Sequence, residues 1–163
     1  ARLVVPGAVA ETHFDGYYVN DVKVEGVHRI ENQSTSQQWV FNIKVVNGKL
    51  IKNNGDYTQW NSNKTITQVE GSGTPLLPLD DVFSIKGESN GTVKRDANLY
   101  QWAARTLPDN PLIKRFTCRW IVKGKIAIRR TNSDVAVIDY GTGQCDNKAT
   151  ITINGTTFEI TLH

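Results

Sequence analysis

Apolar and polar residues alternate along much of this sequence, and that alternation constrains the fold more than any other feature. A period of two residues is typical of β-strands that have one apolar face. The segments that show it are residues 37–46 (QQWVFNIKVV), 115–124 (RFTCRWIVKG), 135–141 (VAVIDYG), 149–155 (ATITING) and 156–163 (TTFEITLH). Asn154-Gly155 lies between the last two segments, and this dipeptide predicts a tight β-hairpin.

We therefore expect an all-β protein built as a two-layer β-sandwich, in which the alternating segments bury one common apolar layer. Residues 115–124 are expected to form one strand, because the alternation runs through them without a break. Asn47-Gly48 and Lys123-Gly124 are expected to mark further turns between strands.

One short helix is expected in addition to the strands. Residues 98–107 (NLYQWAARTL) place Leu99, Trp102 and Thr106 at a period of 3.6 residues. A helix of about three turns is marginal on its own in water, so packing against the strands would have to stabilise it.

A weak internal repeat divides the sequence into two related β units. VKVEG at residues 22–26 is matched by FSIKG at 83–87, and NKTIT at 63–67 by NKATIT at 147–152, in the same order. The expected parts are an N-terminal segment over 1–20, a first β unit over 21–73, a linker over 74–81 and a second β unit over 82–163. The two units are expected to share one core, because the edges of so small a β unit would be poorly covered.

The two cysteines, Cys118 and Cys145, are consistent with one disulfide in an oxidising compartment or with two thiols in a β core. Methionine is absent, even at position 1, so we expect a matured or excised piece of a longer product. No apolar run reaches the length of a membrane span. Contact with a membrane is therefore expected only through an anchor outside this sequence.

The stretch DYGTGQCDNKATITING at residues 139–155, with CRWIVKGKIAI at 118–128 before it and FEITL at 158–162 after it, carries a resemblance. It resembles a recurrent C-terminal module of secreted proteins and lipoproteins from Bacteroidetes. RIENQS and GSGTP upstream resemble the lead unit of the same proteins. The resemblance implies an all-β protein outside the cytoplasm (at the cell surface, in the periplasm or secreted), with no assigned function.

The glycine-rich corner at residues 139–147 raises the question of a metal site. Asp139, Asp146 and Asn147 offer side-chain oxygens of the kind that calcium prefers, but they lack the Asp-x-Asp-x-Asp spacing of known calcium loops. The alternative is a turn in which Asp and Asn accept hydrogen bonds from nearby backbone amides. A nucleophilic role for Cys145 would need a base, and none of the three histidines stands in a catalytic context.

An enzyme is not expected. The sequence has no Gly-x-Ser-x-Gly elbow, no phosphate-binding loop, no dinucleotide fingerprint and no clustered zinc ligands. We therefore expect no cofactor and no catalytic residues.

The tryptophans are the stronger candidates for a binding site. Trp60 lies in the polar run DYTQWNSN, and Trp102 lies beside Tyr100, so these three side chains are predicted to bind a ligand if they are exposed. An exposed aromatic ring offers a flat apolar surface against which a sugar ring can stack. Trp39 and Trp120 lie on apolar strand faces and are expected in the core.

Seven basic residues and no acid lie between Lys114 and Arg130. They are expected to form a solvated hairpin surface, because no aromatic residues are interleaved in the manner of base-stacking proteins. We expect no nucleic-acid partner. The predicted function is a non-catalytic binding or accessory domain of a cell-envelope lipoprotein or secreted protein, whose partner is a glycan or a cell-surface protein. The alternatives are a carbohydrate-binding module and an adhesin-like element that assembles through exposed strand edges.

Overall fold

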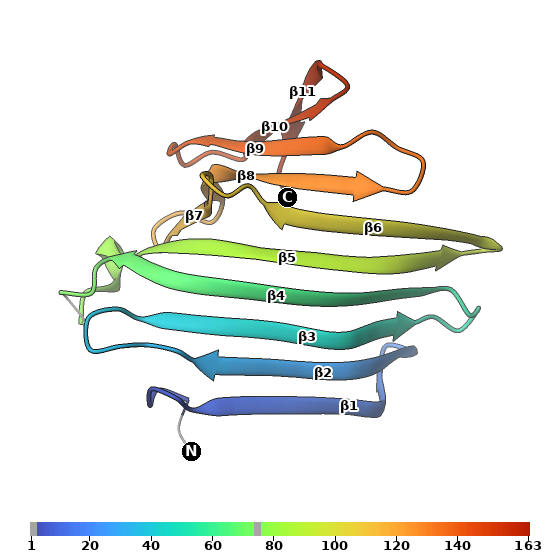
Figure 1. Ribbon diagram of the computed structural model, residues 1–163, viewed down its shortest axis with the longest axis horizontal. Coiled ribbons are helices and arrows are strands. Elements are labelled where there is room, and N and C mark those ends of the chain that lie inside the picture. The colour runs from blue at the N-terminus through green and yellow to red at the C-terminus, as the bar shows by residue number, and fades with distance from the viewer. Residues whose placement is uncertain (1–2, 74–75) are drawn as a thin grey trace.

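The computed structural model describes residues 3–73 and 76–163, and these form one antiparallel β-sheet (Figure 1). The strands are β1 (Val9–Val19), β2 (Val22–Asn32), β3 (Val40–Ile51), β4 (Tyr57–Glu70), β5 (Val82–Arg95), β6 (Asn98–Thr106), β7 (Leu112–Arg115), β8 (Ile121–Arg130), β9 (Ala136–Thr142), β10 (Lys148–Ile153) and β11 (Thr156–Thr161). A 3₁₀ turn, η1 (Pro78–Asp80), precedes β5. Within the described ranges, no helix has the length and apolar character needed to cross a membrane.

The strands follow one another across the sheet in chain order, as Figure 1 shows from blue to red. β6 and β7 together occupy one place between β5 and β8. β6 pairs with the C-terminal half of β5, from Glu88↔Arg105 to Arg95↔Asn98, and β7 pairs with its N-terminal end. Between them the chain leaves the sheet in a short excursion, closed by a Leu107↔Asn110 bridge.

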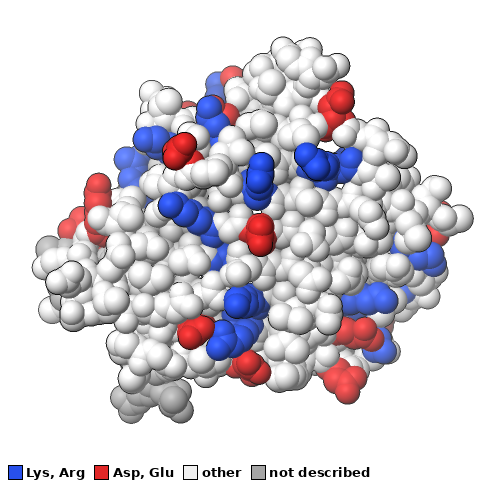
Figure 2. Space-filling model, in the orientation of Figure 1, with Lys and Arg blue, Asp and Glu red and all other residues white. Residues whose placement is uncertain are grey.

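One face of the sheet is charged. The register places Arg29, Lys44, Asn63, Glu88 and Arg105 directly opposite one another in a row that crosses β2 to β6. Residues opposite each other on neighbouring strands point to the same side of a sheet. Figure 2 shows the charged side chains of both signs that this face carries across the strands. This charged face is suited to contact with water.

The opposite face is mostly apolar, with a few polar side chains in its middle. Phe41, Ile66, Ile85 and Leu112 form one of its rows, across β3, β4, β5 and β7. These side chains are covered mainly by their neighbours in the same layer, and the first three remain partly exposed. This apolar face therefore has no second layer over it within the described residues.

The buried core is small and lies near the start of β8. Leu112, Cys118, Val122 and Ala149 are buried there, with Val122 only 1% exposed. The accessible surface is 10786 Å², whereas a compact protein of this mass is expected to expose about 8100 Å². The excess is the consequence of a single layer, in which both faces of most strands reach solvent.

The all-β class predicted from the sequence is confirmed. The second layer of the expected sandwich is not observed, since the described strands all belong to one sheet. Alternation of apolar and polar residues indicates that a strand has one apolar and one polar face. It does not indicate whether a second layer covers the apolar face.

The expected helix over residues 98–107 is wrong, because this segment forms β6. Trp102, Ala104 and Thr106 are half-buried on the apolar face, while Ala103 and Arg105 are exposed on the other. The segment fits both periods, and pairing with β5 and β8 on its two sides decides between them.

Two further expectations about turns are corrected. Residues 115–124 are not one strand, because the chain turns between Arg115 and Cys118 and β8 begins only at Ile121. Neither Asn47-Gly48 nor Lys123-Gly124 is a turn, because the first lies at an irregularity within β3 and the second at one within β8. The hairpin at Asn154-Gly155 is confirmed: both residues have positive φ angles, and Ile153 pairs with Thr156.

The linker expected over residues 74–81 lies between β4 and β5, and residues 74 and 75 are outside the described part of the chain. β4 and β5 are neighbours that pair from Tyr57↔Lys94 to Glu70↔Val82. The sheet is therefore continuous between the two sequence units.

Candidate functional site

Two of the predicted binding residues, Trp60 and Trp102, lie in one row on the apolar face. Trp60 on β4 is opposite Gly91 on β5, and Gly91 is opposite Trp102 on β6. Tyr100 precedes Trp102 by two residues on the same strand and therefore points to the same face; it is 40% exposed. The fold thus brings together all three side chains proposed from the sequence.

Glycines provide the space in which the two indoles lie. A Cβ atom at Gly91 would come within 3.0 Å of the Trp102 ring, and one at Gly48 would come within 3.0 Å of the Trp60 ring. Each indole thus lies against the glycine of the preceding strand. We name this set, Gly48, Trp60, Gly91 and Trp102, the aromatic row. Trp60 and Trp102 are both partly exposed.

A groove of about 1080 Å³ begins at Trp102 and extends toward β10. Its apolar lining comes from Trp102, Ala103, Ile128, Ala136, Ile151 and Ile153. Its polar lining comes from Gln101, Arg129, Arg130, Thr131, Asn132, Ser133 and Asp134. An apolar surface beside several polar groups is the usual composition of a ligand-binding cleft.

The loop between β8 and β9 forms the polar side of this groove and is tied to β6. The Thr131 amide donates to the Gln101 carbonyl at 2.9 Å, and the Gln101 amide donates to Thr131 Oγ1, also at 2.9 Å. Asn132 has a φ of 58°, in the left-handed region that asparagine tolerates better than most residues. These contacts hold the polar groups of the loop in place beside the Trp102 indole.

The polar groove residues were missed by the sequence reasoning. They lie on β6, at the end of β8 and in the following loop, and only the sheet register brings these segments together. The one local signal was the turn-forming run TNSD at residues 131–134.

The other two tryptophans lie elsewhere. Trp39 packs against Phe41, with ring centroids 4.3 Å apart, and against Phe83 at 5.6 Å. It is 38% exposed and therefore is not the core residue that was expected. Trp120 is partly exposed, and the Arg119 guanidinium lies 4.8 Å from its ring centre.

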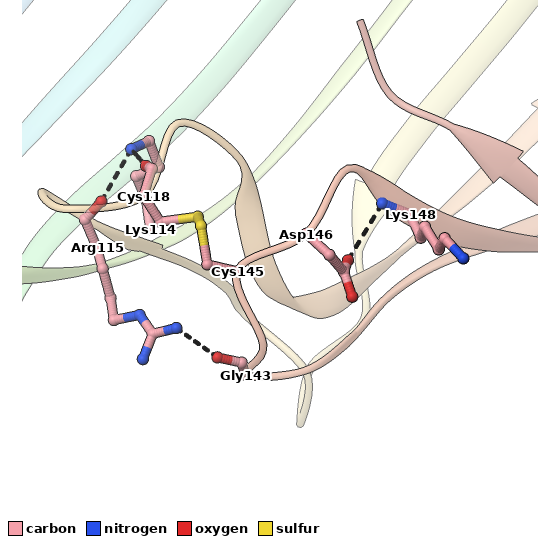
Figure 3. Close-up of a disulfide and its surroundings, with 7 residues drawn as sticks. All are labelled: Lys114, Arg115, Cys118, Gly143, Cys145, Asp146 and Lys148. Atoms are coloured by element: carbon pink, nitrogen blue, oxygen red, sulfur yellow. Dashed lines mark hydrogen bonds between the residues drawn. A yellow bond between two sulfur atoms is a disulfide. The ribbon is translucent and has the colours of Figure 1, made fainter.

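The corner at residues 139–147 is organised around a disulfide between Cys118 and Cys145 (Figure 3). An Arg115 guanidinium nitrogen donates to the Gly143 carbonyl at 2.5 Å, and the Gly143 amide donates to the Val122 carbonyl at 2.9 Å. Lys114 Nζ donates to the carbonyl oxygens of Arg115 and Cys118. These bonds attach the corner to β7 and β8 and enclose the small core.

The two carboxylates proposed as metal ligands bind nearby groups of the protein. Asp139 Oδ1 accepts from the Gly141 amide at 2.9 Å, and its other oxygen lies 3.7 Å from Lys125 Nζ. Asp146 Oδ1 accepts from the Lys148 amide at 3.1 Å (Figure 3). The backbone carbonyl of Asn147 accepts a hydrogen bond from the Leu162 amide. Burial raises the pKa of the neighbouring Tyr140.

Asp139, Asp146 and Tyr140 line a hollow of about 290 Å³ together with Glu159. Among the described residues, no group of three or more His, Cys, Asp or Glu side chains is arranged to hold a metal ion. The observed role of the two carboxylates is to accept hydrogen bonds from turn amides, as in Asx turns.

The basic residues between Lys114 and Arg130 do not form one surface. Arg115 binds the corner, Arg119 lies on Trp120 and Lys125 faces Asp139. Arg129 and Arg130 are consecutive on β8, so their side chains leave opposite faces of the sheet.

No family model, curated protein or solved structure matches this chain. The resemblance to the Bacteroidetes module therefore stays a prediction.

Proposed function

We propose that this chain is a non-catalytic carbohydrate-binding module of an extracytoplasmic protein, either secreted or attached to the cell envelope. The observation that carries the proposal is the groove beside Trp102, which combines an exposed aromatic surface with polar groups on an ordered loop. Trp60 and Tyr100 extend this surface on the same face of the sheet.

Carbohydrates match such a surface chemically. A sugar ring has an apolar face of C–H groups and an edge of hydroxyl groups, so it stacks on an aromatic ring while it exchanges hydrogen bonds with polar neighbours. Trp supplies the largest aromatic surface of any side chain. Asn132, Ser133 and Asp134 supply donors and acceptors of the kind that hydroxyl groups need.

The proposed location is supported by the disulfide. Disulfides form and persist mainly in oxidising compartments, such as the periplasm and the extracellular space. The Cys118–Cys145 bridge is consistent with that setting. It agrees with the location that the sequence resemblance implies.

The test is affinity electrophoresis of the folded chain through gels that contain soluble β-glucan, xylan, galactomannan or pectin. We expect saturable retardation by at least one polysaccharide, and a loss of about tenfold or more in affinity for Trp102→Ala, as for a central aromatic contact. Trp39→Ala is the matched control, because Trp39 is outside the groove and the aromatic row, and it should bind as the unmodified chain does. Unretarded migration in every gel would refute the proposal.

A second candidate function, assembly by strand addition, is favoured by the long edge strand β1. This eleven-residue strand pairs, within the described part of the chain, with β2 alone. An unpaired edge is a template for another strand. The register shifts between Phe14 and Tyr17, and such an irregularity weakens an edge as a template. Sedimentation analysis over a range of concentrations tests this candidate: a monomer throughout would exclude self-assembly, and assembly abolished by His13→Pro, whose amide faces the open edge, would support it.

A further inference from the structure

We infer that the ligand is the interior of an extended, β-linked polysaccharide, which lies across the strands and contacts both Trp60 and Trp102. The inference rests on the proposed function and adds the length, shape and direction of the ligand. Its basis is the spacing of the aromatic row.

The spacing excludes a single sugar ring as the full ligand. The two indoles lie against Gly48 on β3 and Gly91 on β5, which are two strand positions apart. Neighbouring strands lie about 4.8 Å apart, so the indoles are separated by about 10 Å. A sugar ring is similar in size to one indole and cannot stack on both. A ligand that uses both indoles must therefore contain several linked rings.

The surface between the indoles admits a continuous chain. The two indoles lie over β3 and β5, so the surface between them is β4, where the neighbours of Trp60 on the same face are Thr58 and Ser62. Because the side chains there are small, they do not project above the sheet between the two rings. The sugar that lies between the two stacked ones can therefore pass over the sheet without meeting a bulky side chain.

The position of both indoles on one face of the sheet favours an extended ligand, because the sugars that stack on them approach from the same side. In an extended β-1,4-linked chain, successive sugars are turned over relative to each other, and every second sugar presents the same face. A spacing that skips one sugar fits that repeat, whereas a strongly coiled polysaccharide would curve away from one of the two indoles.

The groove indicates where a bound polysaccharide continues beyond Trp102. In the sheet register Arg130 on β8 is opposite Trp102, and the groove continues to Ile153 on β10. From β4 to β10 there are five strand spacings, or about 24 Å. A bound chain therefore enters over Trp60, crosses to Trp102, and ends among the polar groups of the loop over residues 131–134.

The test is isothermal titration with cello-, manno- and xylo-oligosaccharides of two, four and six sugars. For the backbone that binds, we expect affinity to rise at least tenfold from the disaccharide to the hexasaccharide. Trp60→Ala should remove most of that rise, whereas Trp39→Ala, outside the groove and the aromatic row, should leave the rise unchanged. Trp102→Ala should weaken binding at every length.

Equal affinity at all lengths, or a rise that survives in Trp60→Ala, would overturn the inference while leaving carbohydrate binding intact. Failure of every polysaccharide in the electrophoresis experiment would instead refute the proposed function itself. Trp60→Phe keeps an aromatic ring against Gly48 and provides a second variant if Trp60→Ala proves unstable; it should retain part of the length effect. Denaturant unfolding of each variant establishes that it is folded under the titration conditions.

Discussion

The two ends of β8 belong to regions of opposite character. Near its start, Val122 is 1% exposed and Cys118 is 2% exposed, and the disulfide and Arg115 fasten the corner over them. Beyond its end, Tyr100 and Ile153 are 40% and 37% exposed beside an open groove. We call these regions the stapled end and the aromatic end. In a single-layer sheet, a small core with a covalent link stabilises one end, and the other end remains free to bind.

The largest effect on stability is expected from removal of the disulfide. In Cys118→Ser/Cys145→Ser, the sequence separation of 27 residues corresponds to a loss of about 3.5 kcal/mol in the free energy of unfolding, on the chain-entropy treatment. Denaturant unfolding measures this loss. Polysaccharide affinity of the variant that remains folded should be unchanged, because the groove lies at the other end of β8. A large loss of affinity in the folded double variant would show that the two ends are not separate.

A smaller effect is expected at the aromatic row, from Gly91→Val. A Cβ atom there would meet the backbone oxygen of Gln59 and the Trp102 ring, so the row must shift. We expect a loss of about 1–3 kcal/mol in unfolding free energy, typical of overpacking, and weaker polysaccharide binding as well. Gly73→Ala is the matched control, since nothing lies within 4 Å of the added atom. Unchanged binding by Gly91→Val would show that the position of Trp102 is unimportant.

Tyr100→Ala should produce a still smaller effect, confined to binding. Its ring is on the same face as Trp102 but outside the groove, so it can contact only the flank of a bound chain. A reduction of about two- to fivefold in affinity, measured by titration, is the expected outcome for a peripheral contact. A loss as large as that of Trp102→Ala would move the centre of the site to Tyr100.

The smallest effect concerns the charged face and its response to pH. A hydrogen bond from Arg29, at 2.8 Å, lowers the pKa of Glu31 below its ordinary value. Glu31 therefore stabilises the fold above its ordinary pKa, and this stabilisation is lost as the pH falls through the lowered folded-state pKa. NMR titration of the side-chain carboxyl should give a pKa below 4.5, and Arg29→Gln should bring it back up. An ordinary value in the unmodified chain would contradict the assigned contact.

The sequence was sufficient to predict most of the strands, for reasons that particular residues illustrate. Asn154-Gly155 forms a hairpin because both residues adopt the left-handed backbone conformation that its tight turn requires. Asn47-Gly48 is the same dipeptide, but it lies within β3, where the register shifts by one residue. The dipeptide indicates a positive φ angle in both places. Whether the chain reverses there depends on the strands on either side.

The site was predictable in part. Trp60 could be proposed because it occurs in a polar run, and Trp102 because it lies beside Tyr100. Their alignment through Gly91 could not be, since it depends on how β4, β5 and β6 are registered. The groove is also lined by β10, and the place of β10 in the sheet is set by its pairing with β9. Local patterns specify each strand, and the pairing of distant strands specifies the site.

The most direct test of the account is an NMR titration that follows the indole N–H signals of the four tryptophans. The probe is the hexasaccharide that binds most tightly in the calorimetric series, or cellohexaose if none binds there. We expect the Trp60 and Trp102 signals to shift in a saturable manner, while those of Trp39 and Trp120 stay in place. Signals that all remain fixed, or shifts confined to Trp39 or Trp120, would contradict the claim that the aromatic end is the binding surface.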